Sequence, residues 1–150
     1  MNIAIINGPN INLLGIREKE IYGTCAYVDL LNKYDEWAKN LGIEIKAFQS
    51  NVEGEIVNFI QEAYFDKFDG IVINPAAYTH TSIAILDALK ATNIPTIEVH
   101  ISNVNEREDF RKFSYIKEYC IKSIVGKGIE GYRIALEEMK KYLEETKWVI

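Results

Sequence analysis

The chain alternates between short apolar runs and longer segments whose apolar residues recur with helical spacing. Short runs rich in isoleucine and valine predict strands, because β-branched side chains favour extended backbone. The predicted strands are Asn2–Ile6, Ile43–Phe48, Gly70–Asn74, Thr96–His100 and Cys120–Val125. Between and after them, amphipathic periodicity predicts helices over Tyr27–Leu41, Glu55–Asp66, Ser82–Ala91 and about Ile129–Lys147.

Strands that alternate with helices predict right-handed βαβ units and a parallel sheet covered on both faces. Five such strands favour the flavodoxin-like order 2-1-3-4-5, which is an α/β three-layer sandwich. The chain has 150 residues and contains no repeat, low-complexity tract or linker. We therefore expect a single flavodoxin-like domain over residues 1–150.

The composition narrows the range of partners. A net charge of −5 at pH 7 disfavours nucleic acid and anionic membranes, although a small anionic ligand needs only local donors. No secretory signal pattern is found, and no apolar run approaches the ~18 residues of a membrane span. Cys25 and Cys120 form no CxxC or metal-binding spacing, which is typical of reduced thiols. These features predict a cytoplasmic protein.

Polar residues gather in the loops that follow three of the predicted strands. The loops read NGPNINLLG after strand 1, NPAAYTHTS after strand 3 and HISN after strand 4. In an open parallel sheet, ligands bind beyond the carboxyl ends of the strands, at the switch point between strands 1 and 3. The three loops are neighbours in the predicted order, so we expect one polar site there.

Several known site types do not fit these loops. A receiver domain needs acidic residues where the chain has Asn7 and Asn74, and NGPN is not the Ser/Thr-rich phosphate loop of a flavodoxin. The segment GKGIEG (126–131) matches GxGxxG, but no βαβ unit follows it, which favours turn and helix-start glycines. His80 and His100 form no metal-binding motif, and no GxSxG is present.

The segment EVHIS places a carboxylate and an imidazole on one face of a strand, because Glu98 and His100 are two residues apart. A carboxylate in a central strand is costly unless it is paired. A hydrogen bond to Glu98 would fix the imidazole tautomer and stabilise its protonated form, as a general acid requires. A purely structural pair that pins the strand end is an alternative that these residues leave open.

Two further segments carry candidate binding residues. His80 precedes the helix that carries Asp87, about two turns later, so the two are expected to share a face. The alternative is that a hydroxyl residue caps this helix and His80 is incidental; the candidates are Thr79, Thr81 and Ser82.

The segment NEREDFRKFSY places Arg107 and Arg111 four residues apart. Both arginines can pair with Glu108 or lie in solvent. A guanidinium at the carboxyl edge of the sheet is equally suited to hold hydroxyls or a carboxylate. The residues alone leave both interpretations open.

The charged segment GIREKEIYGT supplies a candidate base, since loops on a rigid scaffold often carry chemistry. A tyrosine with a pKa of about 10 is a poor base at pH 7, but a nearby cation favours the phenolate. Lowering that pKa by two to three units takes roughly 3–4 kcal/mol, which the permanently charged Arg17 can supply to Tyr22. Lys19 is a weaker rival, and Tyr22 merely packing the loop is the simpler alternative.

The segments NGPNINLLGIREKEIYG, QSNVEG, NPAAYTHTS, IEVHISN and GKGIEGY, in this order over nearly the whole chain, closely resemble type II 3-dehydroquinate dehydratases. The resemblance implies dehydration of 3-dehydroquinate to 3-dehydroshikimate in the shikimate pathway to chorismate and the aromatic amino acids. It implies a stepwise anti elimination through an enolate, with no metal and no organic cofactor. Type I enzymes, by contrast, form a Schiff base on lysine.

The resemblance also implies the catalytic roles. Tyr22 corresponds to the base, which Arg17 holds as phenolate in a loop that closes over the substrate as a lid. Asn10 corresponds to the asparagine that holds an ordered water beside the enolate oxygen. His100, oriented by Glu98, corresponds to the acid that protonates the departing hydroxyl.

The binding residues follow in the same way. The resemblance implies that Asn74 and the backbone N–H groups of Ile101 and Ser102 bind the substrate carboxylate. His80 and Arg111 would bind ring hydroxyls. Asp87 would reach a neighbouring subunit's site, because family members assemble as trimers packed into dodecamers.

Two positions depart from the family pattern. The family usually has glycine at the position of Ala76, which is expected to tighten the backbone near the carboxylate site. It often has histidine at the position of Phe113, so we expect different packing under Arg111. Alternatives to this enzyme are a non-catalytic binder of a cyclic polyol acid and a flavin or phosphoacceptor signalling module.

Overall fold

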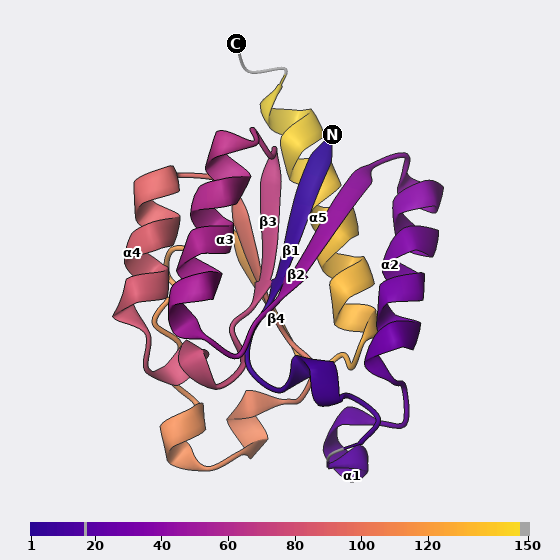
Figure 1. The fold of residues 1–150 in the computed structure, drawn as a ribbon, viewed down its shortest axis with the longest axis vertical. Helices are drawn as coiled ribbons and strands as arrows, with labels where there is room; N and C mark the ends of the chain where they lie inside the picture. Colours follow the sequence, from indigo (N-terminus) through magenta and orange to yellow (C-terminus); the bar gives the residue numbers. More distant parts are fainter. Residues whose placement is uncertain (17, 148–150) are drawn as a thin grey trace.

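The structure, a computed structural model, describes residues 1–16 and 18–147, and it describes Tyr22 by its backbone only. A five-stranded parallel sheet has the order β2-β1-β3-β4-β5, as predicted (Figure 1). The strands are β1 (Asn2–Asn7), β2 (Glu44–Gln49), β3 (Gly70–Asn74), β4 (Thr96–His100) and β5 (Lys122–Val125). This arrangement confirms the flavodoxin-like sandwich.

Helices cover both faces of the sheet, with α2 and α5 on one side and α3 and α4 on the other (Figure 1). The helices are α1 (Lys19–Tyr22), α2 (Tyr27–Leu41), α3 (Glu53–Phe65), α4 (Ile83–Thr92) and α5 (Glu130–Thr146). Short 3₁₀ segments form the loops at the carboxyl edge: η1 (Ile11–Leu13), η2 (Ala76–His80), η3 (Val104–Glu106) and η4 (Asp109–Arg111).

β3, β4 and α2 have the predicted bounds, and the bounds of the other predicted elements differ by one or two residues. α3 begins at Glu53, before the predicted Glu55, and acidic residues in this first turn suit the positive end of the helix dipole. β5 begins at Lys122, because the N–H of Cys120 instead closes a turn with the Ile116 carbonyl, 3.0 Å away. The helix start at Ile83 follows a cap in which the Ser82 hydroxyl accepts a hydrogen bond from the Ile85 N–H.

Strand alternation divides the core into two layers and decides which way each site residue points. Ile5 and Val99 pack with α2 and α5, whereas Ile6 and Ile73 pack with α3 and α4. By the same alternation, the paired residues Asn7 and Asn74 face α2 and α5, while Glu98 and His100 face the opposite layer. At the carboxyl edge, polar side chains therefore lie on both faces of the sheet.

The GKGIEG segment forms a turn before α5, as predicted, and supports the loop after β4. Gly126 and Gly128 have φ values of 72° and 60°, a conformation that favours glycine. Their N–H groups donate hydrogen bonds to the carbonyls of His100 (3.1 Å) and Ile101 (3.0 Å). The glycines thus fix the backbone beside the predicted site.

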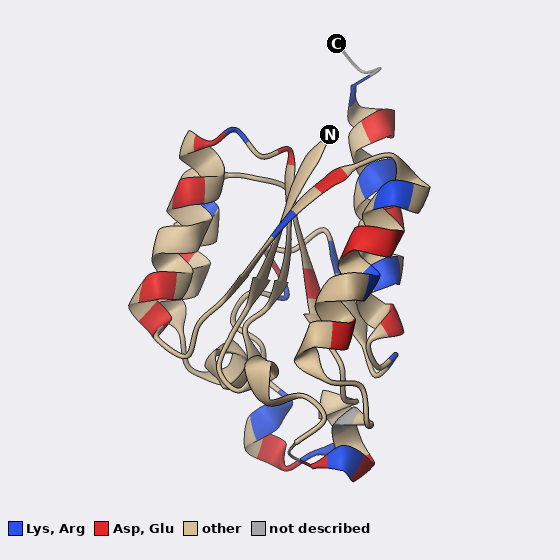
Figure 2. Ribbon diagram, turned by 45° about the vertical axis from the view of Figure 1, so that its right-hand side comes forward, with Lys and Arg blue, Asp and Glu red and all other residues tan. Residues whose placement is uncertain are grey.

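Charged residues lie mainly on the helices and in the loops at the carboxyl edge of the sheet (Figure 2). Within the described part of the chain, no helix has the length and apolar character needed to cross a membrane. Cys25 and Cys120 are both free thiols. Burial raises the pKa of Cys120, which makes this thiol a poor nucleophile.

Candidate active site

The three polar loops and the η3–η4 segment surround a cavity of about 170 Å³ at the carboxyl edge of the sheet. This is the place that the sequence predicted from the strand order. The cavity is lined by Pro9, Asn10, Ile11, Leu14, Asn74, Ala76, Ala77, His80, His100, Ile101, Ser102, Val104, Arg107 and Arg111. Seven predicted site residues therefore line one cavity: Asn10, Asn74, His80, His100, Ile101, Ser102 and Arg111.

Glu98 and His100 form the predicted pair at the end of β4. The His100 Nε2 lies 2.7 Å from the Glu98 Oε1, and both side chains are buried. Two hydroxyls complete the surroundings of the carboxylate: Ser114 Oγ donates to Oε1 at 2.5 Å, and Ser123 Oγ donates to Oε2 at 2.8 Å. Every contact that Glu98 makes here is one that an ionised carboxylate accepts.

The electrostatics agree with that geometry. Burial alone would raise the pKa of Glu98, but the hydrogen bond and charge of His100, with the two serine hydroxyls, hold it below its usual value. Glu98 is therefore the acceptor, and His100 Nε2–H is the donor. The other ring nitrogen, Nδ1, is left for a ligand in the cavity that His100 lines.

The sequence did not predict Ser114 and Ser123 as partners of Glu98. Ser123 lies directly opposite Glu98 in the β4–β5 register, so the two side chains share a face. A hydroxyl beside a buried glutamate was therefore detectable once the strand order and register were assigned. Ser114 comes from the irregular segment after η4, where no periodicity indicates which way a side chain points.

A hydrogen bond to the loop after β2 holds Asn10 in position. Its backbone has a φ of 68°, and its N–H donates to Asn51 Oδ1 at 2.9 Å. Gln49 Nε2 donates to the Gly8 carbonyl at 3.2 Å, which ties β2 to the same turn. A Cβ at position 8 would lie 2.3 Å from the Pro75 carbonyl oxygen, so glycine permits the loops after β1 and β3 to approach.

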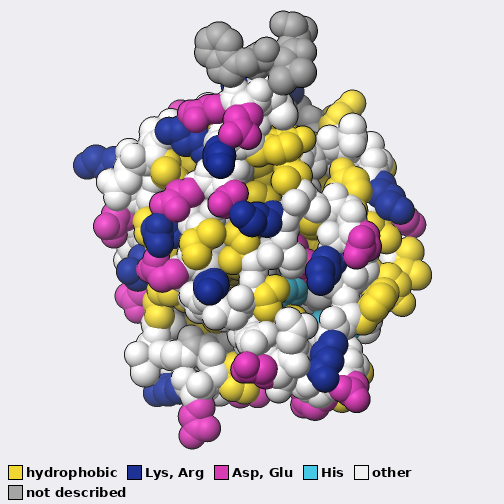
Figure 3. All heavy atoms as spheres, turned by 180° about the vertical axis from the view of Figure 1, so that it is seen from behind, with side chains coloured by type: hydrophobic (Ala, Val, Ile, Leu, Met, Phe, Trp, Pro, Cys, Tyr) yellow, Lys and Arg dark blue, Asp and Glu magenta, His cyan; other side chains and the backbone are white. Residues whose placement is uncertain are grey.

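His80 lines the cavity and is held by a backbone acceptor. Its Nδ1 lies 2.6 Å from the Phe113 carbonyl oxygen, so Nδ1 carries a hydrogen and Nε2 remains for a ligand. Only a small area of histidine is visible on the face seen from behind (Figure 3). His80 thus lies at the predicted site, and Ser82, one of the three capping candidates, caps α4.

Asp87 does not join this cavity. His80 ends η2, whereas Asp87 lies in the separate helix α4, where it is exposed. The expectation that the two residues share a helix face is therefore wrong, because the helix begins only at Ile83. Within this chain, Asp87 lies outside the set of cavity-lining residues.

Arg111 combines both of the interpretations that the sequence left open. Its Nε lies 3.0 Å from Glu108 Oε2, and it also lines the cavity. The guanidinium carbon lies 5.2 Å from the Phe110 ring centroid, a cation–π geometry. The Phe113 ring instead packs edge-on against Tyr115, at 4.9 Å, so the side chain beneath Arg111 is Phe110.

Ala76 adopts a φ of 53°, which is uncommon for a residue with a Cβ. Its N–H donates to Asn74 Oδ1 at 3.1 Å, so this strained turn fixes the amide of Asn74. An L-residue in the left-handed region costs about 1 kcal/mol relative to its relaxed backbone.

The candidate base and its arginine are only partly described. Arg17 lies outside the described residues, and the backbone of Tyr22 ends α1. α1 lies beyond the carboxyl edge of the sheet (Figure 1), and the chain reaches it from Leu14, which lines the cavity. Within residues 1–16 and 18–147, no group of three or more His, Cys, Asp or Glu could hold a metal ion.

Known proteins with a similar sequence and fold identify the family. The family described as dehydroquinase class II matches residues 1–140. A 3-dehydroquinate dehydratase of Clostridium perfringens (strain SM101 / Type A) is 56% identical over 144 residues, 96% of this chain and 99% of that relative. The crystal structure of type II dehydroquinase from Butyrivibrio crossotus DSM 2876 has a TM-score of 0.92 and 55% identity, covering 93% of this chain and 97% of that one.

A more distant solved structure has the same fold. The crystal structure of type II dehydroquinase from Propionibacterium acnes has a TM-score of 0.89 at 40% identity, covering 93% of this chain and 96% of that chain. The family match over residues 1–140 includes every residue that lines the cavity. The chain belongs to the class II dehydroquinase family.

Proposed function

We propose that this protein dehydrates 3-dehydroquinate to 3-dehydroshikimate in the shikimate pathway, with release of one water molecule. The observation that carries the proposal is the buried Glu98–His100 pair, 2.7 Å apart, at the wall of a cavity rich in polar side chains. An imidazole with one nitrogen held by a carboxylate and the other facing a ligand is suited to proton transfer. Membership of this family, with relatives named 3-dehydroquinate dehydratase, supports 3-dehydroquinate as the substrate.

The elimination proceeds in two steps. Tyr22, as a phenolate stabilised by Arg17, removes a proton from the carbon next to the ketone, which leaves an enolate. A water held by Asn10 donates a hydrogen bond to the enolate oxygen. In the second step the enolate reforms the ketone, the C1–O bond breaks and His100, as an imidazolium, gives its Nδ1 proton to the leaving hydroxyl, so that water departs from the opposite face of the ring.

The cavity offers separate groups to the carboxylate and the hydroxyls of the substrate. Asn74 and the backbone N–H groups of Ile101 and Ser102 bind the carboxylate, since all three residues line the cavity. His80 Nε2 and the Arg111 guanidinium bind ring hydroxyls. The loop of Arg17 to Tyr22 closes over the bound ring as a lid and excludes water.

We also propose that the protein acts in the cytoplasm as a homododecamer built from four trimers. The support is the position of Asp87, which is exposed on α4 outside its own chain's cavity and is thus available to a neighbouring subunit's site. Ile83, on the same helix, is an apolar residue at 53% exposure.

The reaction is tested by following the product. 3-Dehydroshikimate contains a conjugated enone that absorbs in the near ultraviolet, whereas the substrate does not. The purified protein is expected to produce this absorbance from 3-dehydroquinate, with turnover far exceeding the protein concentration. Binding of 3-dehydroquinate without absorbance would identify a non-catalytic binder, and a yellow protein would point to a flavin module.

Replacing Asp87 with alanine tests the shared site. Hydrogen bonds to charged groups contribute about 1.5–3 kcal/mol, so activity is expected to fall about 10- to 100-fold. The measurement is kcat/KM together with the molecular mass in solution. Asp35→Ala, which removes another exposed aspartate from a different helix, is the matched control. If Asp87→Ala kept both full activity and assembly, the shared-site proposal would be wrong.

A further inference from the structure

Beneath the cavity, four buried side chains form a continuous run of hydrogen bonds that the proposed mechanism does not use beyond its first member. Asn74 Nδ2 donates to Tyr132 Oη at 2.9 Å, and Tyr132 Oη donates to Asn7 Oδ1 at 2.6 Å. Asn7 Nδ2 then donates to Tyr34 Oη at 3.2 Å. We call this run, Asn74–Tyr132–Asn7–Tyr34, the buried amide chain.

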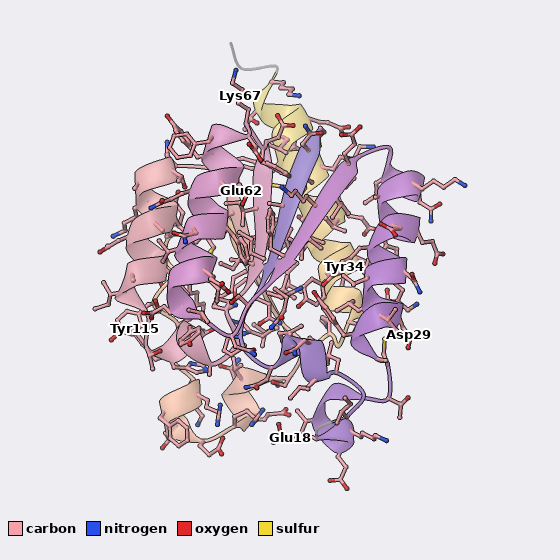
Figure 4. The ribbon with its side chains drawn as sticks, viewed as in Figure 1. Glu18, Asp29, Tyr34, Glu62, Lys67 and Tyr115 are labelled. Carbon is pink, nitrogen blue, oxygen red and sulfur yellow. The ribbon has the colours of Figure 1, made fainter. Side chains whose placement is uncertain are left out.

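The buried amide chain joins elements that are far apart in sequence. Asn7 and Asn74 end β1 and β3 and are opposite each other in the parallel register. Tyr34 comes from α2 and Tyr132 from the first turn of α5, and their rings pack edge to face at 5.3 Å. Figure 4 shows Tyr34 on the inner side of α2, toward the sheet. All four residues are at most 3% exposed.

The donors and acceptors along the chain permit only one orientation of Asn74. Its Oδ1 accepts from the Ala76 N–H at 3.1 Å, so Nδ2 must be the atom that faces Tyr132. Because the single hydrogen of Tyr132 is directed to Asn7 Oδ1, its oxygen can only accept from Asn74. A flipped Asn74 would set two donors against each other at Ala76 and leave buried polar atoms unpaired.

The direction of the hydrogen bonds in the buried amide chain does not depend on pH. Burial raises the pKa of both Tyr34 and Tyr132 well above the usual tyrosine value, so both hydroxyls keep their hydrogens. Hydrogen bonds aligned in one direction also polarise each other, which strengthens the whole run. The second Nδ2 hydrogen of Asn74 is the one donor left for a ligand in the cavity that Asn74 lines.

We propose that Tyr132 is a positioning residue for the reaction: through Asn74, its buried hydroxyl holds an amide N–H ready to bind the substrate. This inference rests on the proposed function. Tyr132 touches no substrate, and its ring faces the core between α2 and α5. Its contribution is to substrate affinity, because a donor held in place before binding loses less freedom when the substrate arrives.

The competing explanation is that both tyrosines have only a structural role. A matched pair of variants distinguishes the two explanations. Tyr132→Phe and Tyr34→Phe each remove one buried hydroxyl from the same run and keep the ring. Both are expected to lower the midpoint of thermal unfolding. Of the two tyrosines, Tyr132 is the one that accepts a hydrogen bond from Asn74, so Tyr132→Phe and not Tyr34→Phe is expected to change substrate binding.

The expected result is a rise of about tenfold in KM for Tyr132→Phe, with kcat changed less than about threefold. Tyr34→Phe is expected to keep KM within about twofold. In the Asn74→Ala background, Tyr132→Phe is expected to add no further increase in KM, since Tyr132 acts through Asn74. A wild-type KM in Tyr132→Phe, equal increases in both tyrosine variants or fully additive effects with Asn74→Ala would each overturn the proposal.

A measurement on the unaltered protein keeps this inference separate from the proposed function. The Asn74 side-chain amide hydrogen that is donated to Tyr132 is expected to give a nuclear magnetic resonance signal distinct from that of the second amide hydrogen and to exchange slowly with water, since it is buried and hydrogen-bonded. Rapid exchange would overturn the inference even if Tyr132→Phe failed to fold. A wild-type protein that makes no enone from 3-dehydroquinate would instead overturn the proposed function.

Discussion

Tyr22→Phe is expected to lower kcat by about 10²- to 10⁴-fold, the contribution of a positioned general base. The substitution keeps the aromatic ring and removes only the hydroxyl. Substrate affinity is expected to survive, because the carboxylate and hydroxyl ligands lie in other loops. The measurement is kcat from the enone absorbance together with the dissociation constant of 3-dehydroquinate.

A matched control removes a hydroxyl from elsewhere on the surface. Tyr64→Phe changes an exposed tyrosine on α3 and is expected to leave kcat unchanged. If Tyr22→Phe kept more than about a tenth of wild-type activity, another residue would have to be the base. An ultraviolet titration of the hydroxyl supplies an independent check, since a phenolate held by Arg17 is expected to ionise below the usual pKa of about 10.

The fold and much of the site followed from local patterns in the sequence. Alternating strands and helices fixed the strand order, and the order placed three polar loops at one edge. The two-residue spacing of Glu98 and His100 was enough to predict their hydrogen bond, because a strand has a period of two. These predictions depended only on neighbours in the chain and on the general rules of parallel sheets.

The partners that hold these residues in place were not predictable in the same way. Tyr132 lies 58 residues from Asn74, and no short motif joins an α5 tyrosine to the end of β3. Ser114 reaches Glu98 from an irregular segment. The orientation of the His80 ring depends on a hydrogen bond to the Phe113 carbonyl oxygen, a backbone atom whose position the sequence pattern does not predict. Local periodicity indicates which face a residue occupies, but packing between layers decides which atoms meet there.

His100→Gln is expected to lower kcat by about 10²- to 10⁴-fold, because glutamine can donate a hydrogen bond to Glu98 but cannot deliver a proton to the leaving hydroxyl. Glu98→Gln keeps the shape of the pair and removes the charge that orients the imidazole. It is expected to lower kcat by a smaller factor, since His100 keeps its ring in the cavity. Activity above about a tenth of wild type in His100→Gln would mean that another group is the acid.

His100→Gln also tests whether the elimination is stepwise. In a stepwise reaction, loss of the acid and loss of the base have different effects. In a stepwise reaction the enolate forms before the hydroxyl leaves, so proton removal does not need His100. In deuterated water, His100→Gln is therefore expected to exchange the hydrogen next to the ketone of 3-dehydroquinate while making little product. Tyr22→Phe is expected to lose both exchange and product. If His100→Gln lost the exchange as well, proton removal and hydroxyl departure would be one step, and the enolate would not be an intermediate.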